Sequence, residues 1–204
     1  MLTTEALFSW QNLLFCLGYA FLGGGIKYID QVFDEKMFSK PAAFVLSVLC
    51  GLLMGYLIAV DAPSATILIS IVLGVAITKK IDNAAFYIGV LLVLGMPLLI
   101  RFSQSAFLSL DMFSIFFLTV AGLIDEWGND EVDRWGTNGI VKKFFYFRFT
   151  MKVMMAVLVF TGVFKPIYLV AFLAFDAAYG LVDWYSNRLL KGKKGLLYSK
   201  PSLF

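Results

Sequence analysis

Aspartates follow the apolar segments of this chain in a repeated pattern. Four apolar runs end in isoleucine or valine followed by aspartate, at Asp30, Asp82, Asp125 and Asp183. Asp34 lies four residues after Asp30, so a helix that continues past Asp30 places both carboxylates on one face. Like charges at this spacing repel each other unless a cation lies between them. Paired carboxylates suit Mg²⁺, which usually keeps several waters and bridges to substrate phosphates. The pattern therefore predicts a magnesium-dependent phosphate site.

Two sets of charged residues form the expected site. The candidate magnesium ligands are Asp30, Asp34, Asp82, Asp125, Asp130 and Asp133. The basic side chains expected to contact phosphate oxygens are Lys27, Lys79, Lys80 and Arg134. Glu35, Glu126 and Glu131 fit ordinary solvated charges better.

Asp176 differs from these residues because it lies near the middle of an apolar run. An ionisable group at that depth in a membrane is costly and usually faces a polar cavity or a partner. Tyr179, Gly180 and Asp183 follow at spacings of three, four and seven, which places them on the same helix face. We therefore expect Asp176 to face protein or water, and we assign catalytic roles to Asp176 and Asp183.

The composition indicates which kind of element positions these residues. Of the 204 residues, 60% are hydrophobic and 15% are charged, and the mean hydropathy is +0.84. Soluble domains contain about 45–50% apolar and about 25% charged residues, so this chain is typical of a membrane protein. A net charge of +3 without a basic, aromatic-rich segment argues against nucleic acid as a partner. The absence of histidine excludes histidine-based catalysis and histidine-ligated metals, and Cys16 and Cys50 lie in apolar runs, where packing is expected.

Seven apolar segments are long enough to cross a bilayer, and they predict an all-α, polytopic transmembrane bundle with a single domain over 1–204. The expected spans are 7–29, 42–60, 64–81, 84–101, 106–124, 149–165 and 166–183. The first segment lacks a preceding lysine or arginine, so we expect a permanent span rather than a cleaved signal.

The distribution of basic residues predicts the orientation of these spans. Fifteen of the 17 lysines and arginines fall in alternate loops and the tail, and only Arg101 and Lys165 remain for the other side. By the positive-inside rule, the N-terminus lies outside and the C-terminus in the cytoplasm, in the cell (plasma) membrane. The cytoplasmic parts are then acidic loops at about 30–41, 78–83 and 125–148 and a basic tail at about 184–204.

Two of the acidic segments resemble a known family. Residues 23–41, Gly-Gly-Gly-Ile-Lys-Tyr-Ile-Asp-Gln-Val-Phe-Asp-Glu-Lys-Met-Phe-Ser-Lys-Pro, resemble the first aspartate-rich motif of UbiA-type intramembrane prenyltransferases. Residues 125–136, Asp-Glu-Trp-Gly-Asn-Asp-Glu-Val-Asp-Arg-Trp-Gly, resemble the second. Phe38 stands where the first motif has its third aspartate. The resemblance implies Mg²⁺-assisted transfer of a prenyl group from a polyprenyl diphosphate to an acceptor within the membrane.

Three functions remain open at this point. The first is an enzyme that acts on a prenyl diphosphate or lipid phosphate with Mg²⁺ at the cytoplasmic face, most simply by prenyl transfer. The alternative is a transporter or channel for a cation or an anionic solute that uses Asp176 and the cytoplasmic carboxylates. The third is a subunit of a larger membrane complex. The expected partner of the enzyme is a membrane lipid or prenyl diphosphate, and the sequence leaves a homo-oligomer open.

Overall fold

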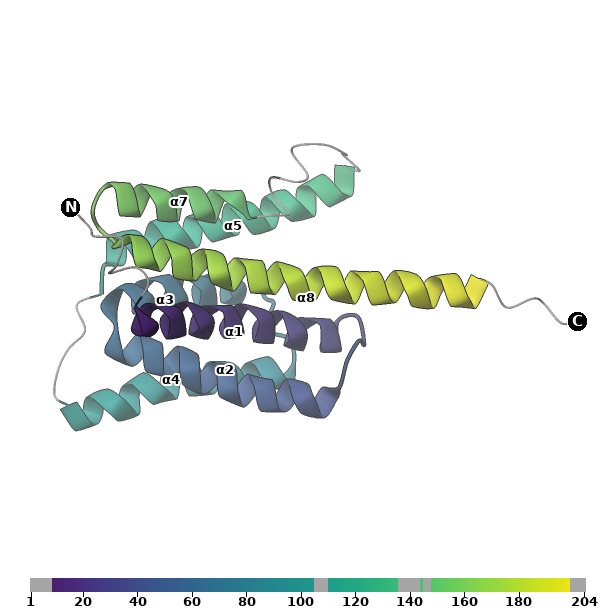
Figure 1. Ribbon diagram of the computed structural model, residues 1–204, viewed down its shortest axis with the longest axis horizontal. Coiled ribbons are helices and arrows are strands. Elements are labelled where there is room, and N and C mark those ends of the chain that lie inside the picture. The colour runs from purple at the N-terminus through teal and green to yellow at the C-terminus, as the bar shows by residue number, and fades with distance from the viewer. Residues whose placement is uncertain (1–8, 105–109, 136–143, 145–147, 199–204) are drawn as a thin grey trace, which may run out of the picture.

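The protein is a bundle of helices (Figure 1). The computed structural model describes residues 9–104, 110–135, 144 and 148–198, without the side chains of 101–104, 129–130, 132–133, 135 and 191–198. In these ranges all regular secondary structure is helical, as predicted, and there are seven helices. They are α1 (Trp10–Phe33), α2 (Lys40–Val60), α3 (Ala62–Ile77), α4 (Ala84–Gln104), α5 (Met112–Trp135), α7 (Phe149–Phe160) and α8 (Pro166–Tyr198).

Several helices begin where the sequence supplies a capping side chain. Ser9 accepts a hydrogen bond from the Asn12 amide at 3.3 Å at the start of α1. Asp61 accepts one from the Ser64 amide at 2.9 Å at the start of α3. Such caps satisfy amides that have no partner within the helix. Proline lies in the first turn of α2 and of α3 and is the first residue of α8, positions where its missing N–H costs nothing.

The helices pack as a closed ring with one helix outside it. Each member contacts the next in the order α1, α2, α3, α5, α7 and α8, and α8 returns to α1. Helix α4 packs against α2. The contact between α1 and α8 is close because α1 carries glycine at position 23, where a methyl group would overlap the carbonyl oxygen of Phe175. The ring therefore surrounds a central space that side chains fill or leave open.

Apolar side chains fill one part of this ring. Tyr19, Leu22, Leu118, Met155 and Ala171 are fully buried there. Many large apolar side chains instead point out of the bundle, among them several along α4 between Tyr87 and Leu99 and along one side of α5. In water such a surface would be unfavourable, whereas lipid tails solvate it.

Three helices are long and apolar enough to cross a membrane, namely α1, α2 and the part of α8 from Pro166 to Leu190. Shorter apolar helices cover 62–77, 84–100 and 149–160. Residues 125–135, which we expected in a loop, instead continue α5, because no proline interrupts the helix there. Likewise α8 extends beyond the expected span end at 183 into the basic tail.

Successive helices run in alternating directions, so the connections gather at two ends of the bundle. The end of α1, the link between α3 and α4, the end of α5 and the start of α7 lie together toward the right of Figure 1, where α8 also projects. The start of α3 and the link between α7 and α8 lie at the opposite end. Lys79, Lys80, Arg134 and Arg148 lie in or next to these segments, at the same end of the bundle as the last part of α1. We call this end of the bundle the basic end.

Candidate functional site

A cavity of about 850 Å³ opens at the basic end of the ring. It is walled by the last part of α1, the link between α3 and α4, the middle of α5, the residue before α7, and α8 from Asp176 to Trp184. Its charged lining residues are Lys27, Asp30, Asp34, Lys79, Lys80, Asp82, Asp125, Glu126, Arg148, Asp176 and Asp183. Seven are acidic and four are basic, so the walls carry an excess of negative charge when all are ionised.

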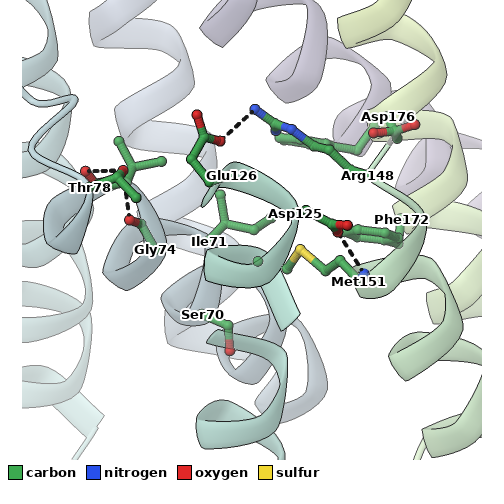
Figure 2. A pocket seen from close by; sticks show the side chains of 13 residues that line it. Ser70, Ile71, Gly74, Thr78, Asp125, Glu126, Arg148, Met151, Phe172 and Asp176 are labelled. Carbon is green, nitrogen blue, oxygen red and sulfur yellow. Dashed lines mark hydrogen bonds and ion pairs between the residues drawn. The ribbon is translucent and has the colours of Figure 1, made fainter. Parts of the chain in front are cut away.

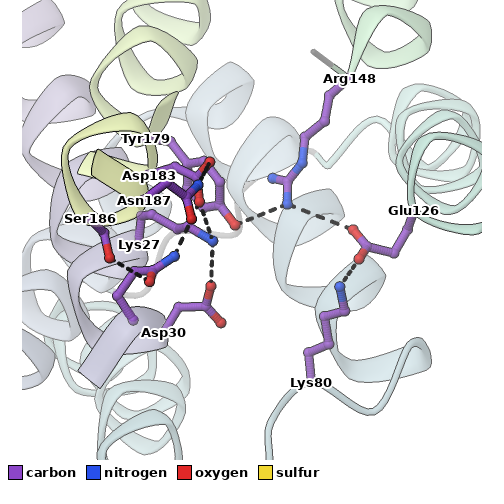
Figure 3. Close-up of polar contacts among 10 residues, drawn as sticks. Lys27, Asp30, Lys80, Glu126, Arg148, Tyr179, Asp183, Ser186 and Asn187 are labelled. Carbon is purple, nitrogen blue, oxygen red and sulfur yellow. Dashed lines mark hydrogen bonds and ion pairs between the residues drawn. The ribbon is translucent and has the colours of Figure 1, made fainter. Parts of the chain in front are cut away.

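Lys27 joins α1 to α8 at one wall of this cavity (Figure 3). Its Nζ lies 2.7 Å from Asp30 Oδ2 and 3.1 Å from Asp183 Oδ1, and its side chain is only 12% exposed. The buried Gln31 donates to Asp183 at 3.1 Å and accepts from Ser186 at 2.7 Å. Asp30, a candidate metal ligand, and Asp183, a candidate catalytic residue, are thus both held at this wall by ion pairs or hydrogen bonds.

Asp176 has a basic partner on α7. Its Oδ2 lies 2.7 Å from the Nζ of Lys152, and both side chains are less than one-fifth exposed. Asp176 lines the cavity as well. This carboxylate therefore faces protein and the cavity.

Asp125 is almost completely buried and accepts two backbone hydrogen bonds. The Thr150 amide donates to Oδ1 at 2.9 Å and the Met151 amide to Oδ2 at 2.8 Å. These amides belong to the first turn of α7, where no intrahelical acceptor is available. Asp125, on α5, therefore caps the start of α7. A metal ion at Asp125 would have to bind the oxygen lone pairs that do not accept these hydrogen bonds.

Arg148 bridges two sides of the cavity (Figure 3). Its Nη2 lies 3.7 Å from Glu126 Oε2 on α5 and donates to the Tyr179 hydroxyl on α8 at 3.2 Å. Glu126 is paired with Lys80 on its other oxygen. Tyr179 raises the pKa of Arg148 most, against the opposing effect of burial, and Asp176 and Asp125 add to it. The guanidinium therefore stays charged.

Asp34 lies just after α1, where carboxylates crowd together. Partial desolvation raises the pKa of the exposed Asp34, and the neighbouring Asp30 and Asp82 raise it further. Crowding of this kind favours a cation between the carboxylates. Among the residues that the structure describes, no group of three or more Asp, Glu, Cys or His side chains is arranged as a metal cage.

The bundle also holds two smaller chambers. The inner chamber, about 50 Å³, shares Asp125, Glu126, Arg148 and Asp176 with the cavity (Figure 2). Its remaining lining is mostly apolar: Ser70, Ile71, Gly74, Val75, Thr78, Gly122, Met151, Phe172 and Phe175. A second chamber of about 80 Å³ lies among α1, α2, α3 and α4 and shares Ile71 and Val75 with the inner one. The charged cavity thus adjoins a smaller chamber whose remaining lining is mostly apolar.

The structure brings most of the expected site residues to this one cavity. Those that line it are Lys27, Asp30, Asp34, Lys79, Lys80, Asp82, Asp125, Asp176 and Asp183. Arg134 is instead mostly exposed and pairs with Glu131 at 3.1 Å. The side chains of Asp130 and Asp133 lie outside the described part of the chain.

Sequence reasoning missed three charged residues of the site. The positive-inside rule uses Lys152 and Arg148 only as cytoplasmic cations, and the sequence favours a solvated charge at Glu126. In the structure Glu126 is only 15% exposed. The chain matched no family model, no curated protein and no solved structure when it was compared with them. The fold and its three candidate transmembrane helices indicate an α-helical membrane protein with a charged cavity.

Proposed function

We propose that the protein crosses the membrane seven times, with its N-terminus outside and its C-terminus in the cytoplasm. We further propose that it is a magnesium-dependent enzyme acting on a prenyl diphosphate or lipid phosphate at the cytoplasmic face, by prenyl transfer. The observation that carries this proposal is the amphipathic cavity: carboxylates and cations line its mouth, and a smaller, mostly apolar chamber adjoins it. An amphiphile with a phosphate head and a hydrocarbon chain has the same division.

The charges at the mouth favour a phosphate that enters together with cations. Seven acidic residues face four basic ones, so a bare diphosphate would be repelled. Mg²⁺ reverses this balance, and it commonly binds through one or two carboxylates plus substrate phosphates. Asp30 and Asp34 are the carboxylates best suited to hold it, because they lie close together and both line the mouth of the cavity. A bound ion would stabilise negative charge on the leaving diphosphate.

The residues of the chain would share out the remaining tasks. Lys27, Lys79 and Lys80 would neutralise phosphate oxygens, and the apolar floor would hold the first part of the hydrocarbon chain. In prenyl transfer the bond between the first carbon and the diphosphate oxygen breaks, and that carbon forms a bond to an acceptor that gives up a proton. Asp176 lies on the boundary between mouth and floor, where a carboxylate would orient the acceptor or stabilise a carbocation.

The proposed topology predicts which substituted cysteines can be labelled from each side. In a variant lacking Cys16 and Cys50, Asp82→Cys should react with an impermeant maleimide only from the cytoplasm. Val163→Cys, in the exposed link between α7 and α8, should react only from outside. The reason is that basic residues gather at the end of the bundle that holds Asp82. Labelling of both positions from the same side would contradict the alternation of spans.

The proposed chemistry predicts the effect of Asp34→Asn. With radiolabelled farnesyl diphosphate, Mg²⁺ and a membrane-lipid extract as acceptor, the variant should form at least about 100-fold less product, as expected when a metal-site carboxylate is lost. It should stay folded, because removing a crowded, exposed carboxylate relieves repulsion. Circular dichroism and product counting measure the two effects. Glu131→Gln, an acid outside the cavity, is the matched control.

Equal turnover by Asp34→Asn and the unaltered protein over a range of Mg²⁺ concentrations would remove Asp34 from the site. Absence of any magnesium-dependent product with prenyl diphosphates and lipid phosphates would reject the enzyme. The second candidate is then a transporter or channel for a cation or anionic solute. The ion pair between Lys152 and Asp176 inside the bundle favours that candidate specifically, because such pairs mark ion pathways in membranes.

A further inference from the structure

Glu126 is an internal anion for two cations of the cavity wall. It pairs with Lys80 from the link between α3 and α4 and with Arg148 from the residue before α7. Its side chain is only 15% exposed, although the residue follows a span in a strongly acidic segment. The neighbouring Asp125 is poorly placed to pair with these cations, because its oxygens accept hydrogen bonds from the backbone amides of Thr150 and Met151.

Arg148 is placed where the head and the chain of an amphiphile would meet. It lines both the cavity and the inner chamber, and Figure 2 shows its guanidinium directed toward Glu126. Its guanidinium lies 4.5 Å from the centre of the Tyr179 ring. It thus reaches from α7 toward α5 and α8. A guanidinium carries five donors and binds phosphate through two parallel hydrogen bonds, which a carboxylate also accepts.

We propose that Glu126 is a displaceable competitor: it holds Arg148 and Lys80 until a phosphate group enters and takes its place on Arg148. This inference rests on the proposed function, and it adds a binding residue and a selection rule to it. A phosphate carries more charge and more acceptor oxygens than a carboxylate, so it can win this exchange. A neutral head, or a zwitterionic one whose phosphodiester carries a single negative charge, has no such advantage over the carboxylate. The exchange therefore selects anionic phosphates over the neutral headgroups of surrounding lipids.

The test compares the affinity of purified variants for two probes. Inorganic pyrophosphate represents a free phosphate, and farnesyl diphosphate in detergent micelles represents a lipid headgroup, each titrated with Mg²⁺ by calorimetry. Glu126→Gln keeps the size of the side chain and removes the competing charge. We expect it to bind both probes about tenfold more tightly, as removal of one close charge predicts. Arg148→Gln should bind about tenfold more weakly than the unaltered protein.

The double variant separates displacement from a general change of charge. If Glu126 acts through Arg148, Glu126→Gln should no longer tighten binding when Arg148→Gln is also present. Glu131→Gln is the control, because the same helix carries this second acid–arginine pair outside the cavity. It should leave both affinities unchanged. Should Glu126→Gln fail to fold, Glu126→Asp keeps the charge on a shorter side chain, and we expect an affinity above that of the unaltered protein.

The outcomes distinguish the two proposals. Magnesium-dependent binding by the unaltered protein, with no tightening in Glu126→Gln, would reject the competitor and leave the enzyme standing. Tightening that persists with Arg148→Gln would likewise reject it, as a general charge effect. Tight binding of pyrophosphate with no preference for farnesyl diphosphate would show a free phosphate as the ligand. Failure of every variant to bind either probe would overturn both proposals.

Discussion

Replacing Lys27 with methionine is expected to destabilise the protein by about 3 kcal/mol, since breaking a buried ion pair on one side leaves charges without compensation. Lys27 lies 2.7 Å from Asp30 and 3.1 Å from Asp183, and its own side chain is 12% exposed. Methionine keeps the length of the side chain but removes the cation between two carboxylates. Those carboxylates would then repel each other across the contact between α1 and α8. Unfolding in detergent, followed by circular dichroism, measures the loss.

Lys36→Met is the matched control because Lys36 is an exposed lysine in the link after α1. Exposed substitutions away from such networks usually change stability by less than about 0.5 kcal/mol. Combining Lys27→Met with Asp183→Asn should recover part of the lost stability, because one of the two repelling charges is gone. A Lys27→Met protein as stable as the Lys36→Met control would show that the pair contributes little to the fold.

The gathering of Asp30, Asp82 and Asp183 at one cavity could be predicted from the sequence. Each follows an apolar run, and alternate runs return to the same end of an antiparallel bundle. The basic residues of the loops marked that end independently. The structure confirms that these three residues line a single cavity. Short-range patterns suffice here because the end of an apolar run marks one end of the bundle, even where the helix continues, and connectivity determines the direction of each helix.

The partners of these residues could not be predicted in the same way. The expected span 149–165 already contains Lys152, but local spacing does not show that this side chain meets Asp176 on another helix. Asp125 accepts a hydrogen bond from the first turn of α7 although it is 25 residues away in the sequence, and local spacing does not predict that contact either. Glu126 was taken for a solvated acid because its two cations come from other elements. Tertiary packing, rather than local spacing, determines these pairs.

The ion pair between Lys152 and Asp176 gives the prediction that separates the two candidate functions. Both side chains are less than one-fifth exposed and lie 2.7 Å apart. Asp176→Leu removes the carboxylate beside Lys152, and Lys152→Met removes the cation beside Asp176. Each single change should cost about 3 kcal/mol, because it leaves a desolvated charge. The double change Lys152→Met with Asp176→Leu should restore most of that stability, since replacing such a pair by apolar residues is often neutral. Unfolding of the four proteins measures the coupling.

Function should not recover with stability, because Asp176 lies at the boundary between the charged mouth and the apolar floor. On α8 it is seven residues from Asp183, or about 10 Å at 1.5 Å per residue. A substrate whose phosphate lies near Asp183 would reach Asp176 with the first carbons of its chain. The stable double variant should therefore bind prenyl diphosphate but form almost no product. Full activity of the double variant would show that the pair is only a structural contact.

Product formation in detergent, where no gradient exists, would exclude transport as the sole activity, because transport needs two separated compartments. Solute flux into proteoliposomes that requires Asp176, with no product formed, would instead reject the enzyme.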